Sequence, residues 1–122
     1  MPALYAGTTI ELCALEKFVH LAGIAHPPLV LVAVDIPDAH LPTKRLAPDR
    51  LPPGWADLPV SGASQGVGRD WLRAAQDLVL LVPSAIIPEA TNAVINPAHP
   101  AFLQVRLSIM RPFSFDARLF KA

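Results

Sequence analysis

The fourteen prolines among the 122 residues restrict this chain more than any other feature, because each fixes φ and removes a backbone donor. Their share is about twice the average usage of roughly 5%. They do not cluster into a low-complexity tract. Most stand at the edges of apolar runs, where a sheet does not need the missing N–H. The chain is therefore expected to form short elements joined by stiff turns, and because no linker divides it, residues 1–122 are predicted to be a single domain.

The patterns between the prolines predict the order of the elements. A short strand is expected at residues 4–6, followed by a helix that opens at the capping-box sequence Thr8-x-x-Glu11, runs to about Leu21 and stops at Gly23. Further strands are expected at residues 29–36, 78–82, 94–95 and 102–110, and a second helix at residues 64–75. The proline-rich connection over residues 37–63 is too long for a simple loop and is expected to contain short turns.

The predicted fold class is α+β. Strands outnumber helices and a parallel βαβ rhythm is absent, so we expect a curved, mostly antiparallel sheet with one principal helix against it. On that helix, six residues recur at helical spacing, and all of them except the lysine are apolar: Ile10, Cys13, Ala14, Lys17, Phe18 and Leu21.

Charge and hydropathy exclude several classes of function. Ten basic and ten acidic residues balance, so direct binding of nucleic acid is not predicted. No apolar stretch approaches the roughly 18 residues that cross a bilayer, and no signal peptide is visible. A single cysteine, Cys13, agrees with a reducing compartment. With 52% hydrophobic residues, we expect a cytoplasmic protein without a membrane partner that hides apolar surface in a homo-oligomer.

The candidate chemical groups leave several readings open. Glu16 precedes His20 by four residues, which could contribute to a metal site, but no third ligand is apparent and no metal is predicted. Helical periodicity alone favours a Glu16 that faces solvent beside the histidine. Ser84 could be a turn residue, a ligand contact or a nucleophile, although no histidine is placed to serve it. Tyr5 could be core or a stacking platform. The glycine-containing segment at residues 61–68 supports a phosphate loop only weakly.

Four blocks of the sequence resemble the RES-domain family. They are ALYAGTTIELCALEKFVHL, GWADLPVSGASQGVGRDWL, LVLLVPSAIIPEATNAVINPAHPAF and FSFDARLF. They follow in order over essentially the whole chain. No single block is decisive, but four in sequence are highly specific.

The resemblance implies a toxin of a type II toxin–antitoxin pair with a fold similar to ADP-ribosyltransferases. Such a toxin consumes NAD, its substrate, by breaking the nicotinamide–ribose bond, with water, phosphate or a protein as acceptor. By the same resemblance Glu16 and Ser84 are catalytic residues, and Tyr5, Ser84 and Asn96 bind the substrate. The implied partner is a helix-turn-helix antitoxin, which would bind the DNA.

One departure from the family pattern concerns an arginine. The family's arginine lies in a G-x-R-[WF] strand before the tyrosine, and the sequence contains no such motif, so the RES domain is expected to be incomplete at its N-terminus. Arg45, Arg50 and Arg69 lie in other blocks. An anionic pyrophosphate would then lack a bidentate clamp. Two alternatives follow: a catalytically impaired RES-fold protein that only binds an antitoxin-like partner, or a domain that binds another small ligand.

Overall fold

The structure is a computed structural model that describes residues 2–21, 27–38, 41–56 and 62–120, with side chains omitted at residues 62–65. Its elements follow one another as β1 (Leu4–Gly7), α1 (Ile10–Leu21), β2 (Leu29–Asp35), β3 (Thr43–Arg45), η1 (Pro48–Arg50), α2 (Gly62–Ala74), β4 (Val79–Pro83), β5 (Thr91–Ile95), η2 (Pro100–Gln104), β6 (Arg106–Phe113) and η3 (Ala117–Phe120), where η marks a 3₁₀ helix. The predicted stop of the first helix at Gly23 lies outside the described residues.

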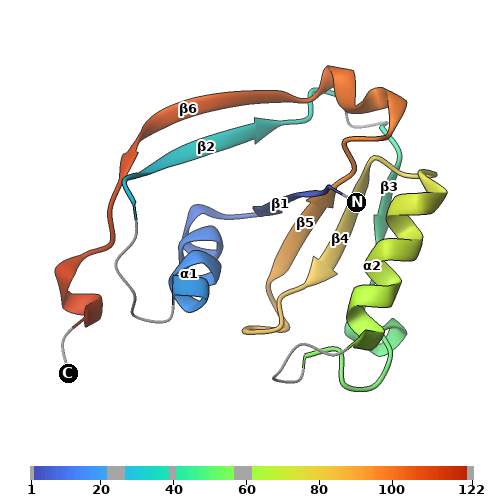
Figure 1. Cartoon of the computed structure of the whole chain (residues 1–122), viewed down its shortest axis with the longest axis horizontal. Helices are drawn as coiled ribbons and strands as arrows, with labels where there is room; N and C mark the ends of the chain where they lie inside the picture. The colour runs from blue at the N-terminus through green and yellow to red at the C-terminus, as the bar shows by residue number, and fades with distance from the viewer. Residues whose placement is uncertain (1, 22–26, 39–40, 57–61, 121–122) are drawn as a thin grey trace.

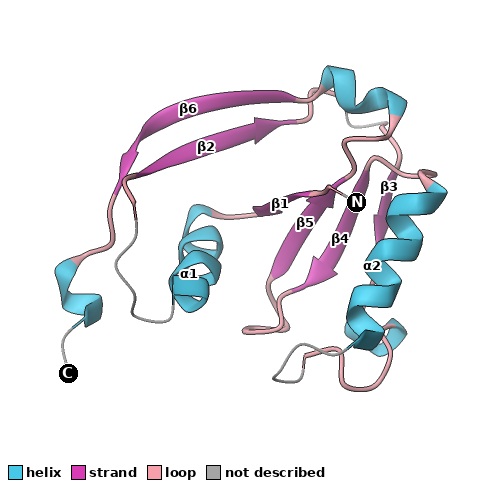
Figure 2. Cartoon of the chain, in the orientation of Figure 1, coloured by secondary structure: helices cyan, strands magenta, loops and turns pink. Residues whose placement is uncertain are grey.

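The strands form two sheets, as Figures 1 and 2 show. Four of them pair in the order β1-β5-β4-β3, and β2 pairs with β6 in a long two-stranded ribbon that arches over β1 and α1. All pairs except β3–β4 are antiparallel. The predicted α+β class and the mostly antiparallel pairing are confirmed, while the strands divide between two sheets.

The parallel pair corrects the expectation that no βαβ unit is present. β3 lies beside β4 in parallel, and α2 connects the two strands along the chain. No sequence pattern predicts β3, because the strand has only three residues, Thr43–Arg45, and all of them are exposed and polar. With η1, it supplies the short structure expected inside the proline-rich connection.

One face of the four-stranded sheet is covered by α2. Trp71 and Leu72 of this helix pack against Leu80 of β4, and all three side chains are buried. Figure 1 shows α2 running along β4 and β3. At 13 residues α2 is one residue longer than α1, which has 12, so two helices rather than one principal helix accompany the sheet.

The opposite face of the sheet packs on the end of the β2–β6 ribbon. Leu78, Val79 and Ile95 form its buried centre, and Val34 and Phe102 are among the residues that pack against them. The predicted strand at residues 102–110 begins only at Arg106, because Pro100 opens a 3₁₀ turn before it. Neighbouring residues of β4 therefore point into two different cores, which fixes this strand from both sides.

Helix α1 begins one residue later than the capping box suggested. The hydroxyl of Thr9, not Thr8, accepts a hydrogen bond from the backbone N–H of Leu12 at 3.1 Å. Thr8 instead donates to the carbonyl of Thr91 on β5 at 2.7 Å. Leu12 is the buried residue of the helix, and it lies outside the predicted apolar stripe. That stripe marks the helix correctly, but part of it faces an open groove instead of the core.

The glycine-containing segment is helical rather than a phosphate loop. Residues from Gly62 onward belong to α2, so Gly66 and Gly68 lie within a helix. Their Cα hydrogens face open space, because an added Cβ would meet no atom within 4 Å. The weak phosphate-loop reading is therefore wrong.

Gly7 has the opposite environment, and this contrast gives a test of how closely α1 approaches β1. A Cβ on Gly7 would lie 2.8 Å from the backbone nitrogen of Cys13, a contact that only movement of α1 can relieve. We expect Gly7→Ala to lower the free energy of unfolding by about 1–3 kcal/mol, the usual range for overpacking.

Gly66→Ala is the matched control for this substitution. It should raise the free energy of unfolding by about 0.5–1 kcal/mol, because alanine is the better helix former and the site is open. Chemical denaturation measures both variants. Equal stability of Gly7→Ala and the parent would contradict the close approach of α1 to β1.

Candidate active site

The candidate site lies where α1 meets the turn between β4 and β5. Glu16 is half-buried on α1, and its Oε1 atom accepts two hydrogen bonds. The hydroxyl of Ser84 donates one at 2.7 Å, and the side-chain amide of Asn92 donates the other at 2.8 Å. Two residues far along the chain therefore fix one carboxylate oxygen. The expectation that Glu16 faces solvent is therefore wrong, because its carboxylate is bound by two side chains of the fold.

Ser84 is fully buried, and all of its hydrogen-bonding capacity is used. Besides donating to Glu16, its oxygen accepts from the backbone N–H groups of Ile86 and Ile87 at 3.1 and 3.2 Å. The N–H of Ser84 donates to the carbonyl of Ala90 across the turn at 2.9 Å. One donor and two acceptor positions exhaust a hydroxyl. In this structure Ser84 therefore shapes the turn and orients Glu16.

Asn92 is the residue of the site that the sequence reasoning missed. It lies on β5 opposite Val82 of β4 and Gly7 of β1, and its side chain stands out of the sheet toward Glu16 on α1. A signal was available, because Asn92 is the first asparagine of the N-x-x-x-N-P stretch that ends at Asn96. That spacing separates the two amides along the strand but does not reveal which one reaches α1.

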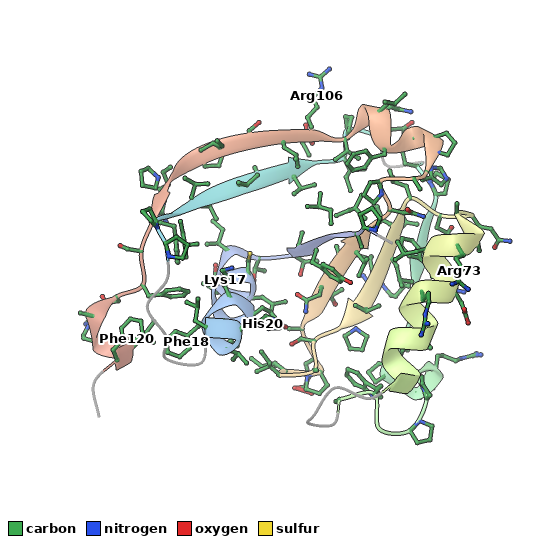
Figure 3. All side chains as sticks on the ribbon, in the orientation of Figure 1. Lys17, Phe18, His20, Arg73, Arg106 and Phe120 are labelled. Carbon is green, nitrogen blue, oxygen red and sulfur yellow. The ribbon has the colours of Figure 1, made fainter. Side chains whose placement is uncertain are left out.

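A pocket of about 500 Å³ opens beside this carboxylate. From α1 it is lined by Cys13, Glu16, Lys17 and His20, which follow the one-turn spacing of a single helix face. The sheet and the turn after β4 contribute the remaining wall: Tyr5, Ala6, Gly7, Val82, Ala85, Asn92 and Val94. Figure 3 shows Lys17 and His20 on α1, and Tyr5 is 75% exposed at the pocket. Tyr5 is therefore a surface residue of the pocket and not core.

Asn96 lies outside the residues that line this pocket. Its amide donates to the carbonyl of Leu72 near the end of α2 at 3.0 Å, and its oxygen accepts from the N–H of Ala98 at 3.0 Å. The side chain is fully buried. Its predicted contact with the substrate would require this amide to leave both partners, and the contacts observed instead join α2 to the end of β5.

Positive charge at the pocket comes from α1 and not from an arginine. Lys17 and His20 are the basic side chains among the lining residues. Arg118 does not line the pocket, and its guanidinium is paired with the carboxylate of Asp116, with Nε–Oδ1 and Nη2–Oδ2 distances of 2.8 Å. The side chain of Arg118, and then its backbone N–H, lower the pKa of Asp116 to about 2. An anion in the pocket would therefore meet an ammonium or an imidazole.

The described residues contain neither a cluster of possible metal ligands nor a helix that could span a membrane. Among them, no three His, Cys, Asp or Glu side chains gather in a way that could hold a metal ion. Within the same ranges, no helix combines the length and apolar character that a membrane-spanning segment needs.

The arrangement can stabilise a positive charge. Oε1 of Glu16 is held by two donors, whereas Oε2 has no hydrogen-bond partner among the described residues. A carboxylate fixed in this way and facing a pocket is an electrostatic partner for a cation that develops during bond cleavage. Because its orientation is set in advance, no reorganisation is needed when that charge appears.

Replacing Ser84 tests whether the serine orients the carboxylate. Ser84→Ala removes the donor to Glu16 and leaves two backbone N–H groups of the turn without an acceptor. We expect a loss of about 1–3 kcal/mol in the free energy of unfolding, because a partly buried hydrogen-bond network loses its central hydroxyl. Ser114→Ala, at an exposed serine, is the control and should change little. Equal effects in the two variants under chemical denaturation would contradict the role assigned to Ser84.

Comparison with known proteins identifies the family. The model of the RES domain matches residues 1–116. A relative from Sphingobium sp. (strain YBL2), named Prs ADP-ribosylating toxin, is 36% identical over 120 residues, which cover 97% of this chain and 74% of the relative. A Toxin Res from Yersinia enterocolitica is 32% identical over 120 residues, covering 96% of this chain and 77% of that protein. Another Toxin Res, from Photorhabdus laumondii, is 32% identical over 123 residues, covering 99% and 78%. The resemblance seen in the sequence is thus confirmed: the chain belongs to the RES-domain family.

Proposed function

We propose that this protein is a toxin that consumes NAD by cleaving the bond between nicotinamide and ribose. The observation that carries the proposal is the Glu16 carboxylate, held at 2.7 and 2.8 Å by Ser84 and Asn92 on one oxygen while the side chain lines a pocket of about 500 Å³. That volume lies within the usual range for small-molecule sites, roughly 300–1,000 Å³. Relatives named as RES toxins, one of them as an ADP-ribosylating toxin, support the same activity.

The proposed reaction places the developing charge next to Glu16. When the glycosidic bond breaks, its electron pair leaves with the nicotinamide nitrogen, and positive charge builds on the ribose ring. The carboxylate of Glu16 stabilises that charge, as carboxylates do at other glycosidic bonds. An acceptor then forms the new bond to the same ribose carbon and loses its proton. Water, phosphate and a protein side chain each fit this scheme, and the name of the Sphingobium relative favours ADP-ribosyl transfer.

Three further residues have distinct parts in the proposal. Tyr5, exposed at the pocket, offers a ring on which nicotinamide or ribose can stack. Ser84 and Asn92 act through Glu16 by holding its oxygen. This assignment makes Ser84 a positioning residue, because its hydroxyl is buried and has no donor left for a substrate.

The alternative function is a RES-fold protein that is impaired in catalysis and only binds an antitoxin-like partner. The charge of the pocket supports this alternative, because no arginine is among the described residues that line it. Expression in cells separates the two functions. An active toxin should deplete NAD and halt growth, and co-expression of a helix-turn-helix antitoxin should relieve the arrest. Normal growth with unchanged NAD would favour the alternative.

Glu16→Gln is the direct test of the proposed chemistry. Glutamine keeps the shape and an oxygen that can still accept from Ser84 and Asn92, so the thermal midpoint should change little. The rate of nicotinamide release from NAD should fall roughly a hundredfold to a thousandfold, the usual effect of losing one preorganised electrostatic group.

Glu11→Gln is the matched control for Glu16→Gln. Glu11 lies on the same helix but is exposed and outside the pocket, so its rate should stay at the parental value. If Glu16→Gln releases nicotinamide as fast as the parent, the carboxylate is not catalytic. If it unfolds instead, Glu16 is a structural residue.

The β2–β6 ribbon supports the expected homo-oligomer. Leu107, Ile109 and Met110 of β6 are all more than half exposed, with Ile109 at 74%. Leu107 and Ile109 share one face of the strand because side chains alternate along it, and exposed apolar side chains that lie side by side are typical of an interaction surface. We expect light scattering to give at least a dimer for the parent and a monomer for Ile109→Lys. Leu103→Lys, at a 93% exposed leucine outside the ribbon, should leave the mass unchanged. A monomer at all concentrations of the parent would refute the oligomer.

A further inference from the structure

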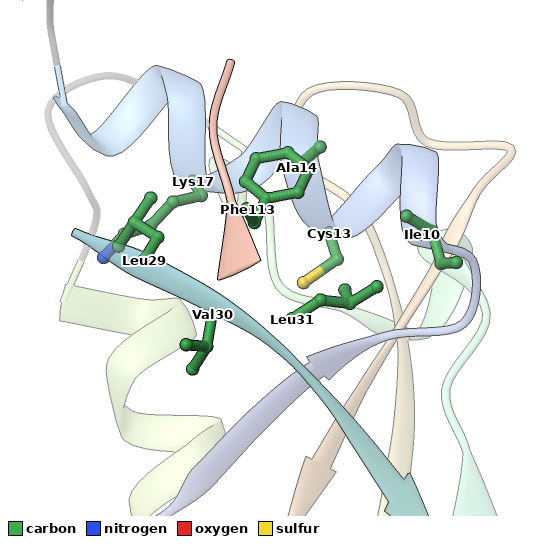
Figure 4. A pocket seen from close by; sticks show the side chains of 8 residues that line it. All are labelled: Ile10, Cys13, Ala14, Lys17, Leu29, Val30, Leu31 and Phe113. Carbon is green, nitrogen blue, oxygen red and sulfur yellow. The ribbon is translucent and has the colours of Figure 1, made fainter. Parts of the chain in front are cut away.

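A second hollow lies along an adjacent face of α1, between this helix and the β2–β6 ribbon (Figure 4). We call it the α1–β2 groove. Its volume is about 250 Å³. Helix α1 contributes one wall, and the opposite wall comes from β2 and from Phe113 at the end of β6. Neither the candidate active site nor the proposed reaction uses this groove.

The α1–β2 groove adjoins the active-site pocket along α1. Cys13 and Lys17 line both of them, one helical turn apart on the same helix. In Figure 4 both residues lie on the part of α1 that faces β2. A ligand that occupies the pocket at Glu16 and extends past Lys17 therefore enters the groove without leaving the surface of α1.

The two hollows differ in chemistry. The pocket holds a carboxylate, an amide and a phenol, from Glu16, Asn92 and Tyr5. The groove is walled mainly by apolar side chains, among them Leu29, Leu31 and Phe113, and Lys17 is the charged residue among those that line it. A ligand that spans both hollows suits this lining if it has a polar, cationic end beside Glu16, an anionic group near Lys17 and an end with apolar surface in the groove.

The dinucleotide of the proposed function has that sequence of parts, and the present inference rests on that function. We propose that the adenosine half of NAD lies in the α1–β2 groove, and that Lys17 at the junction binds the pyrophosphate. The nicotinamide riboside half then lies at Glu16. Charge supports this orientation, because the pyrophosphate stays on the ammonium side and the cationic ribose lies beside the carboxylate.

Size and rigidity agree with a partial ligand in the groove. A volume of about 250 Å³ is below the usual lower limit of roughly 300 Å³ for a complete small-molecule site, so the groove suits a fragment. Phe113 is held by Phe115 in an edge-to-face contact with ring centroids 5.2 Å apart, and the Arg111 guanidinium lies 5.6 Å from its ring centre. The apolar wall is thereby formed before a ligand arrives.

Lys17 has the properties that a pyrophosphate contact needs. Its side chain is exposed, and among the described residues the ion pair present joins Asp116 to Arg118, so Lys17 has no competing carboxylate. An ammonium binds a phosphate as a point charge with three donors. In this way Lys17 compensates for the lack of an arginine among the pocket residues.

Two variants test the groove without touching the carboxylate. Ala14 lines the groove and not the pocket, so Ala14→Leu fills the groove while keeping a strong helix former. Lys17→Gln removes the charge at an exposed position, where unfolding is not a concern. The matched controls are Ala74→Leu on exposed helix surface and Lys44→Gln on exposed β3.

Calorimetric titration with ADP and with nicotinamide riboside gives the readout. The parent should bind both probes. Ala14→Leu should weaken ADP at least tenfold, and Lys17→Gln should weaken ADP roughly ten- to a hundredfold, the usual effect of losing a charged hydrogen bond. Ala14→Leu should not change nicotinamide riboside binding, and Lys17→Gln should change it much less than it changes ADP binding, because Lys17 also lines the pocket. Neither control should change any binding.

The outcomes separate this inference from the proposed function. ADP that binds both variants as tightly as the parent, or that fails to bind the parent, overturns the groove assignment. Nicotinamide release from NAD is measured on the same proteins. Absence of release together with variant-sensitive ADP binding removes the proposed function and keeps the groove as an ADP site. Release that depends on Glu16 but not on Lys17 or Ala14 keeps the function and removes the groove.

Discussion

The hydrogen bonds that converge on Oε1 of Glu16 hold the functional part of this molecule together. They join α1 to the turn after β4 and to β5, across sequence separations of 68 and 76 residues. The strand that presents Ser84 is itself fixed, because Val79 and Leu80 are buried in two different cores. The carboxylate thus takes its position from the packed sheet, although it belongs to a helix with only one buried residue.

The stretch N-x-x-x-N-P, which begins at Asn92, contains a second asparagine with a structural role. Asn96 ties the last turns of α2 to the end of β5, and its oxygen holds the N–H of Ala98 in the turn before η2. The side chain of His99 caps the next turn, because its Nδ1 accepts a hydrogen bond from the N–H of Ala101 at 3.0 Å. Because prolines at 97 and 100 fix φ on either side, few conformations remain for this turn. Asn92 therefore orients the carboxylate of Glu16, whereas Asn96 joins α2 to the end of β5.

Sequence patterns predicted the elements that carry strong local signals. The helix at Ile10–Leu21 and the apolar strands at Leu29–Asp35 and Val79–Pro83 fall close to their expected positions. β3 was missed because three polar residues that pair only with a distant strand leave no pattern of their own. Glu16 and Ser84 were candidates from their local sequence, but only the family resemblance made them catalytic residues of one site, since no local spacing links them. Asn92 escaped because which of two asparagines faces α1 depends on the register between β4, β5 and β1.

Helix geometry explains how one element can serve both halves of an extended ligand. Glu16 and Lys17 are neighbours, so their side chains leave α1 about 100° apart at nearly the same height. The carboxylate reaches the β4–β5 turn, while Lys17 lines both the pocket and the α1–β2 groove. Gly7 permits this by letting α1 approach β1 so closely that a Cβ would lie 2.8 Å from the backbone of Cys13. A substrate that crosses α1 would therefore have its bond to be broken and its anionic centre positioned by one rigid helix, and a shift of that helix would displace both contacts together.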